Sequence, residues 1–134
     1  MKIKSNIQVT ELNRDQFIQV LENNNLKVTN NEKIRFKDLI KTYTPRYYPR
    51  FKPTISGEFY RNEWKINLDS VIFKSFLLGI STYIFFWANN AEIKTRIIIP
   101  IIFMIINYWI NQLIIKTRIE NIESYFRKSI KNNH

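Results

Sequence analysis

The chain has no cysteine, two glycines and a single histidine, His134, which is its last residue. Without cysteine there is no disulfide bond, no thiolate nucleophile and no cysteine-based metal site. One terminal histidine supplies neither a histidine general base nor the common zinc sites. The sequence also lacks a glycine-rich phosphate loop and the spacing of metal ligands. We therefore expect no cofactor, no metal and no enzymatic activity.

Charge is nearly missing from two stretches of the second half, residues 71–87 and 97–115, whose one charged residue is Lys74. As helices the two runs would reach roughly 25 and 28 Å, close to the roughly 30 Å thickness of the bilayer hydrocarbon. A soluble core of this apolarity would need more covering chain than the remaining residues supply. The pattern predicts a transmembrane helical hairpin with residues 89–96 as its loop.

The regions on either side of the hairpin are patterned for folding in water. We predict an α+β membrane protein with a cytoplasmic strand and helix module over residues 1–70. The hairpin then occupies residues 71–115, and its long second helix extends into a cytoplasmic amphipathic helix and tail, residues 116–134. We expect this extension to dock on the chain's own module, rather than lie along the headgroups or form a short coiled coil. Its apolar stripe consists of Ile115, Ile119, Ile122, Phe126 and Ile130.

Basic residues flank the hairpin unevenly. Lys74 lies near the start of the first run, and Lys116 and Arg118 follow the second, whereas the loop carries Lys94 and Arg96. The positive-inside rule then places both termini in the cytoplasm and the loop outside the cytoplasmic (inner) membrane. The long stems of Lys74, Lys116 and Arg118 suit contact with lipid headgroups. The first ten residues lack the continuous apolar core of a signal peptide.

A few small and polar residues interrupt the two runs. Ser75, Gly79 and Thr82 share one face of the first helix, where another backbone can approach closely. Asn107 and Asn111 lie one helical turn apart on the second helix, and an amide facing lipid is unfavourable. We predict that these residues pack helices, within the hairpin or between copies. The alternative is a polar lining of a pore or ligand path, which requires an oligomer because two helices cannot enclose a pore.

The N-terminal module begins with alternation and continues with helical spacing. Ile3, Ile7 and Val9 keep period 2 and predict a strand. A short helix capped by Asn13 follows. Its predicted buried face consists of Phe17, Val20 and Leu21.

The first of two predicted β-hairpins joins a strand that contains Leu26 and Val28 to a strand that contains Ile34 and Phe36. Residues 30–32 form its loop, because Asn tolerates the left-handed conformation that such a loop needs. In this register the two apolar pairs face each other.

The second predicted hairpin occupies residues 55–68, with a two-residue turn at Arg61 and Asn62. One register gives a continuous apolar face and an opposite-charge pair, so pattern and pairing agree. Arg-Asn is not a preferred turn pair. We expect Asp69 or Ser70 to cap the helix that follows. The predicted pairs are Phe59 with Trp64, Gly57 with Ile66, and Glu58 with Lys65.

Basic and aromatic residues alternate between prolines in residues 41–53. Pro45, Pro49 and Pro53 recur every four residues, which excludes a regular helix and favours extended structure. Cations mixed with aromatic rings suit anionic lipid headgroups or a protein partner, and nucleic acid least. The other interpretation is an extended segment that crosses the surface of the module. The candidate contact residues are Lys41, Arg46, Tyr47, Tyr48, Arg50, Phe51 and Lys52.

Pro53 and Gly57 form a P-x-x-x-G turn into a strand pair that ends W-x-I-x-L at Trp64, Ile66 and Leu68. A hydrophobic hairpin follows. In this pattern the chain resembles small two-span bacterial membrane proteins of unknown function. The resemblance implies the same architecture and carries over no functional residue.

Two hypotheses about function follow. The first is a non-enzymatic integral membrane protein whose cytoplasmic module binds or regulates a protein partner, as an adaptor, a subunit of a complex or an immunity-type protein that blocks a toxin. The alternative is an oligomeric pore-forming protein of the holin type. The expected partners are the lipid bilayer, a protein and, in the second hypothesis, further copies of the chain; nucleic acid is not expected.

Overall fold

The computed structural model describes residues 1–30, 33–38 and 55–132. These residues form an α+β structure with one sheet and three α-helices. The chain divides into two compact units, of which the first comprises Met1–Asn67 and Ile115–His134 and the second Leu68–Ile114. The last helix, α3 (Ile93–Asn132), contributes residues to both units.

The first unit is built on an antiparallel sheet with the strand order β1-β5-β4-β3-β2. Consecutive strands from β2 to β5 form a meander, and β1 adds to its β5 edge. Apolar and polar residues alternate along these strands, so one face is buried and the other is solvated. The strands are β1 (Lys2–Lys4), β2 (Leu26–Asn30), β3 (Ile34–Asp38), β4 (Ser56–Tyr60) and β5 (Glu63–Ile66).

The β4–β5 hairpin has the register predicted from the sequence. Phe59 pairs with Trp64, and Glu58 pairs with Lys65. The turn also lies where expected, because Arg61 and Asn62 both have positive φ, 48° and 58°, as a type I′ turn requires. Arg is poorly suited to that conformation, so the pairing of the two strands, and not the turn residues, determines the position of this turn.

Gly57 pairs with Ile66, again as predicted. A Cβ atom at Gly57 would clash with the backbone carbonyl of Lys65. The close approach of β4 and β5 therefore requires glycine at this position.

The β2–β3 hairpin differs from its predicted register by two residues. Val28 pairs with Phe36, and Leu26 lies opposite Asp38 instead of Phe36. Asn30, placed in the loop by the sequence analysis, pairs with Ile34 in the ladder, and residues 31–32 lie outside the described residues. A shift of two residues keeps every side chain on the same face. Alternation alone therefore fixed the faces but not the register.

The predicted N-terminal strand is shorter than expected. Ile3 lies in β1 and pairs with Trp64, whereas Ile7 and Val9 lie outside any strand. The last main-chain bond of this edge runs from Ser5 N to Asn62 O, at 2.9 Å. Beyond it the chain leaves the sheet, although the side chain of Ile7 is still buried.

Helix α1 (Arg14–Asn23) follows a 3-10 turn, Glu11–Asn13. Asn13 occupies the N-cap position, but its side chain does not cap α1 as predicted. Its Oδ1 instead accepts a hydrogen bond from Thr10 N at 2.7 Å, because the 3-10 turn comes first and uses the side chain for its own N-terminus. The predicted buried face of Phe17, Val20 and Leu21 is confirmed.

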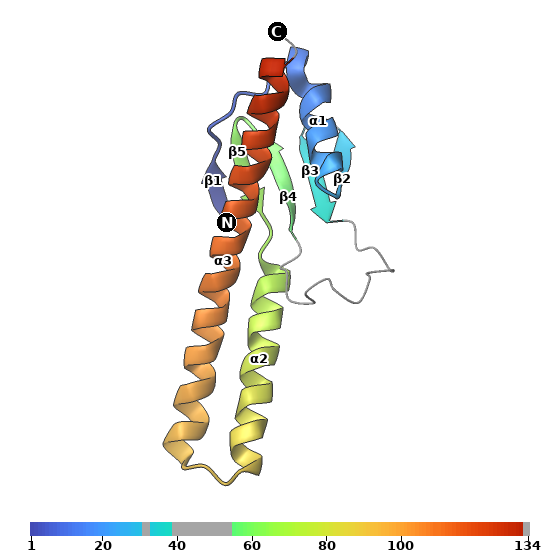
Figure 1. Cartoon of the computed structure of the whole chain (residues 1–134). Helices are drawn as coiled ribbons and strands as arrows, with labels where there is room; N and C mark the ends of the chain where they lie inside the picture. The colour runs from blue at the N-terminus through green and yellow to red at the C-terminus, as the bar shows by residue number, and fades with distance from the viewer. Residues whose placement is uncertain (31–32, 39–54, 133–134) are drawn as a thin grey trace. The chain divides into compact units, whose positions relative to one another are not determined.

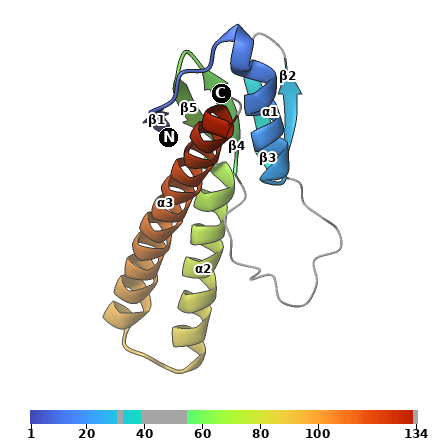
Figure 2. The same ribbon diagram turned by 45° about the horizontal axis from the view of Figure 1, so that its top comes forward.

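Helix α1 and the C-terminal part of α3 lie on the same face of the sheet (Figure 1). The second view shows the same arrangement of the two helices against the strands (Figure 2). Phe17 of α1 contacts Phe126 of α3 and Trp64 of β5, with ring centroids 5.1 and 5.7 Å apart. The predicted docking of the amphipathic extension on the chain's own module is thus confirmed. Four residues of its stripe are buried: Ile115, Ile119, Ile122 and Phe126.

The second unit contains α2 (Asp69–Ala88) and the part of α3 that ends at Ile114. Two boundaries differ from those expected. Leu68 is the N-cap residue of α2, so Asp69 lies inside the first turn, where a carboxylate is favoured by the helix dipole. The connection between the helices is residues 89–92, because the polar residues after Glu92 already belong to α3. Polarity marked the end of the apolar run but not the start of the helix.

Candidate functional site

The segment that the sequence analysis favoured for partner or headgroup contact lies outside the described residues. These are Lys41, Arg46, Tyr47, Tyr48, Arg50, Phe51 and Lys52. Their contact role stays a prediction. The candidate surfaces below come from the described residues of the two units.

Inside the hairpin unit, one polar contact joins the two helices. The Nδ2 of Asn107 donates a hydrogen bond to the Oγ of Ser75 at 2.9 Å, and Ser75 is buried. One turn further along α2, the side chain of Met104 occupies the space that a Cβ at Gly79 would need. The three small or polar residues Ser75, Gly79 and Asn107 therefore lie where α2 and α3 meet.

Two other polar residues of the hairpin bond to their own helices. The Oγ1 of Thr82 donates to the carbonyl oxygen of Leu78 at 2.8 Å. The Nδ2 of Asn111 donates to the carbonyl oxygen of Asn107, also at 2.8 Å. Both side chains satisfy a donor locally, as polar side chains in apolar helices commonly do.

Large apolar side chains cover the outside of this unit. Phe73 and Phe85 of α2 are 61% exposed, and Trp109 of α3 is 65% exposed. Two of the described helices, α2 and α3, are long and apolar enough to cross a membrane by length and composition alone. In their most apolar stretches only 17% and 11% of the residues are buried. An exposed apolar surface of this extent is typical of a surface that contacts lipid or another protein.

Of the three residues predicted to contact headgroups, Lys74 and Lys116 are exposed. Arg118 has a different environment, in the first unit. Its Nη2 lies 2.5 Å from Oδ1 of Asp38, and its Nη1 donates to Oδ2 at 2.8 Å. Such a bidentate pair holds a guanidinium in one orientation.

The Arg118 pair joins three elements. Arg118 lies on α3, Asp38 ends β3, and the carbonyl oxygen of Asn24, after α1, accepts a further bond from Nη2 at 3.3 Å. Oδ2 of Asp38 also accepts a hydrogen bond from the backbone N–H of Ile55 at 2.6 Å. The sequence predicts lipid contact for Arg118, and no sequence pattern indicates this pairing, because its partners are far away along the chain.

A second carboxylate is enclosed more completely. Glu123 of α3 is 3% exposed. Its Oε1 accepts hydrogen bonds from Trp64 Nε1 at 2.7 Å and from Ser5 Oγ at 2.8 Å. Its Oε2 accepts from the backbone N–H of Asn6 at 3.3 Å, and Arg127 lies 4.0 Å away. A buried carboxylate so well supplied with donors is a structural anchor between α3, β5 and the N-terminal segment.

The solvated face of the sheet is strongly basic, and we call it the cationic face. Directly opposite residues of antiparallel strands lie on one side of the sheet, so Lys2, Lys65, Glu58 and Arg35 form one row across four strands. The two acidic side chains in the strands of this face are Glu58 and Glu63, both half-buried. The cationic face consists of the exposed residues Lys2, Lys4, Lys27, Arg35, Lys37 and Lys65.

The cationic face was missed by the sequence analysis, although its signal was present. The strand sequences KIK, IRFKD and EWKI alternate basic and apolar residues. Alternation identifies the buried side of each strand, and the basic residues occupy the intervening positions. Only the pairing of the strands brings these cations together on one face.

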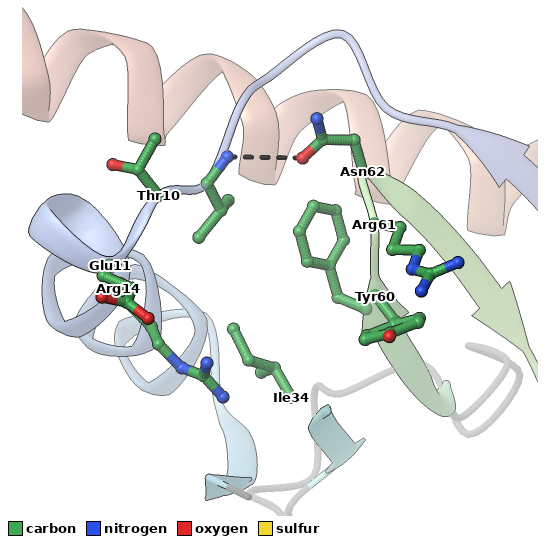
Figure 3. A pocket seen from close by; sticks show the side chains of 9 residues that line it. Thr10, Glu11, Arg14, Ile34, Tyr60, Arg61 and Asn62 are labelled. Carbon is green, nitrogen blue, oxygen red and sulfur yellow. Dashed lines mark hydrogen bonds between the residues drawn. The ribbon is translucent and has the colours of Figure 1, made fainter. Parts of the chain in front are cut away.

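A hollow of about 190 Å³ lies between the N-terminal segment and the β4–β5 turn (Figure 3). Glu11 and Arg14 line one side, and Tyr60, Arg61 and Asn62 line the other (Figure 3). Oδ1 of Asn62 accepts a bond of 3.4 Å from the backbone N–H of Val9 and so spans the hollow. The lining contains one carboxylate, Glu11, and no histidine or cysteine.

Over the described ranges 1–30, 33–38 and 55–132, no group of three His, Cys, Asp or Glu side chains is arranged to hold a metal ion. Comparison with protein families, curated proteins and solved structures gives no match to this chain.

Proposed function

We propose that the chain is an integral membrane protein whose hairpin anchors an α+β binding module at the cytoplasmic face of the membrane. The single observation that carries this proposal is the contrast in burial. Trp64 and Phe126 of the first unit are 0% exposed, whereas Phe85 and Trp109 of the second are 61% and 65% exposed. In water such an outer surface would cost about 25 cal/mol for every Å² that stays uncovered. Lipid removes this cost.

The interior of the hairpin favours an anchor over the holin-type alternative. A pore lined by Asn107 would need its amide to face the channel, and that amide already bonds Ser75 of the neighbouring helix. The space beside Gly79 is likewise occupied by the side chain of Met104. The polar and small residues are thus used within one hairpin, which is what helix packing requires.

The proposed binding role rests on the closed structure of the first unit and on its charged outer surface. The sheet is joined to the first helix of the anchor by only two residues, since β5 ends at Ile66 and α2 begins at Asp69. A short connection keeps the module at the membrane, where it would meet a partner. The partner is a protein, as an adaptor, complex subunit or immunity-type protein requires.

Membrane insertion is tested by fractionation. After lysis, the chain should stay in the membrane pellet through carbonate washing and be released by detergent. Release by carbonate alone would contradict insertion.

The absence of native cysteine allows the topology to be read with single-cysteine variants. Glu92→Cys, in the connection between the helices, should react with a membrane-impermeant maleimide in intact cells. Asn121→Cys, exposed on the C-terminal part of α3, should react only after lysis. The reverse pattern would show the opposite orientation.

A partner is sought by mild detergent extraction and affinity purification of the full chain. The proposal expects one protein to be recovered repeatedly in fixed ratio. Recovery of the chain alone, as a single copy, in repeated preparations would contradict the binding role while leaving the anchor intact.

A further inference from the structure

Two pairs of lysines lie directly opposite each other on the cationic face. Lys2 of β1 pairs with Lys65 of β5, and Lys27 of β2 pairs with Lys37 of β3. Like charges at directly opposite positions destabilise a sheet. Lys2 and Lys27 lie on the two edge strands, where lysine also discourages pairing with another sheet. A second lysine directly opposite each of them costs stability, and a ligand of opposite charge would offset that cost.

The acidic side chains of the same face do not remove this repulsion. Glu58 lies beside Lys65, but its carboxylate is also approached by Lys33 at 3.7 Å and Arg35 at 3.5 Å. The Lys27–Lys37 pair has no carboxylate opposite it, because the next residue across the sheet from Lys37 is Ser56. Within the described part of the chain, neither lysine pair forms a salt bridge.

A hollow of about 550 Å³ lies over the strands between the two pairs. With strands about 4.8 Å apart, the centres of the two lysine pairs are about 14 Å from each other across the sheet. Four or five residues of extended chain cover about that distance. The hollow is lined by four cations, one carboxylate and a serine, among others: Lys2, Arg35, Lys37, Lys65, Glu58 and Ser56.

We propose that the cationic face binds an acidic segment of a protein partner, with carboxylates that reach both lysine pairs. This inference rests on the proposed function of the first unit as a binding module, and it names the chemistry of the partner. A carboxylate placed on each pair would attract both ammonium groups and so offset the repulsion between them. They would also steer the approach of the partner over a long range.

The surface chemistry favours a protein over the other polyanions. Binding to a lipid surface combines the attraction of cations to anionic headgroups with apolar side chains that enter the headgroup layer. The exposed large apolar residues described in the first unit, Leu12 and Tyr125, lie outside the sheet, so the cationic face supplies the first contribution alone. Nucleic acid would use aromatic rings as stacking platforms. Tyr60, the aromatic residue in the strands of this face, already has Lys33 at 5.5 Å and Arg61 at 5.1 Å from its ring centre.

The test measures binding of a labelled Glu-Ser repeat peptide to the full chain in mild detergent, by fluorescence anisotropy. The variant Lys37→Gln with Lys65→Gln removes one cation from each lysine pair. The matched control is Lys128→Gln with Lys131→Gln, two exposed lysines of α3 with the same change of charge. We expect the face variant to bind about two- to thirtyfold more weakly than the unmodified chain, and the control to bind within about twofold of it.

Parallel probes distinguish the alternatives. These are a Gln-Ser repeat peptide, a single-stranded RNA and mixed micelles of the detergent and phosphatidylcholine, with and without phosphatidylserine. Equal losses in the face variant and the control would overturn the proposal, because binding would then follow net charge alone. Stronger binding to RNA or to the micelles with phosphatidylserine, lost in the face variant, would also overturn it in favour of that ligand. Binding of the unmodified chain that does not weaken with added salt would contradict the electrostatic basis even if the variant failed to fold.

The assay separates this inference from the proposed function. It is performed in detergent, so it can succeed even if fractionation contradicts membrane insertion. Conversely, a partner that co-purifies equally well with the face variant would leave the binding role in place and remove the cationic face from it.

Discussion

The two units of this chain differ in where their large apolar side chains lie, which is in the interior of the first unit and on the outer surface of the second. In the first unit Phe17, Trp64 and Phe126 meet in one aromatic cluster with none of their surface exposed. In the second unit the contact between helices uses Ser75, Gly79 and Asn107, and the aromatic side chains point outward. The first arrangement is typical of a protein folded in water, and the second is typical of helices whose outer surface contacts lipid or another protein. The side of the structure on which large apolar side chains lie, inside or outside, is therefore opposite in the two units of one chain.

The largest expected effect comes from opening the aromatic cluster. Phe126→Ala removes a fully buried ring that packs on Phe17 and should lower the free energy of unfolding of the first unit by about 4 kcal/mol. Tyr125→Ala changes the neighbouring residue, which is 57% exposed, and should change it by less than about 0.5 kcal/mol. Guanidinium unfolding in detergent, followed by Trp64 fluorescence with Trp87 and Trp109 replaced by Phe, measures both. Similar losses in the two variants would show that this part of α3 is not docked as described.

The corresponding experiment in the second unit changes an exposed residue instead of a buried one, because there the outer surface is the apolar side. Ile106→Asp, at the middle of the apolar part of α3 and 51% exposed, should disfavour membrane insertion by about 3 kcal/mol. On the surface of a soluble protein the same change should be within about 0.5 kcal/mol and should improve solubility.

Fractionation with Ile106→Val as the control measures this difference. A chain with Ile106→Asp that remains in the membrane pellet as fully as the control would remove the contrast between the two units.

Polar anchoring provides the third comparison. Glu123→Ala would leave the Trp64 indole N–H without its acceptor, and the Ser5 hydroxyl would keep only the carbonyl oxygen of Ile7, at 3.3 Å. The change should destabilise the first unit by about 2 kcal/mol. Glu120→Ala alters an exposed carboxylate one turn earlier on the same helix and serves as the control. The measurement is the same Trp64 unfolding assay, in which loss of the indole hydrogen bond should also shift the emission of the folded state. An unchanged midpoint would show that water replaces the carboxylate.

Part of each unit could be predicted from the sequence. Patterns that act over a few residues were sufficient for the hairpin of β4 and β5, where the register of Phe59 with Trp64 follows from one apolar face and one charge pair. They were also sufficient for the amphipathic stripe of α3, whose period identifies its buried side. The α+β class follows from the same periodicities, and the two apolar helices follow from the length and composition of the two uncharged runs.

Features that depend on residues distant in sequence were not predictable. Arg118 bonds Asp38 across 80 positions, and Glu123 bonds Ser5 across 118. No local pattern distinguishes such side chains from solvated ones, so Arg118 was assigned to headgroups. The register of β2 and β3 was wrong for a related reason, because alternation is preserved by a shift of two residues. The cationic face needed both the strands and their pairing before its members could be grouped.

The smallest expected effect concerns the outer surface of the first unit, where interactions between charges, and not burial, determine how a substitution changes the free energy of unfolding. Lys27→Glu would convert the repulsive pair with Lys37 into an attractive one, and should raise the free energy of unfolding by about 0.5 kcal/mol at low salt. The gain should disappear in high salt, because both side chains are exposed. Lys27→Gln, which only relieves the repulsion, should give a smaller gain in the same unfolding assay.

A gain in stability combined with weaker binding of the acidic peptide would show that the lysine pairs are kept for recognition at the expense of the fold. A loss of stability in both variants would mean instead that Lys27 contributes to the edge strand through contacts other than its charge. The contrast in apolar burial between the two units would still hold. The repulsion between lysines, from which the function of the cationic face was inferred, would not.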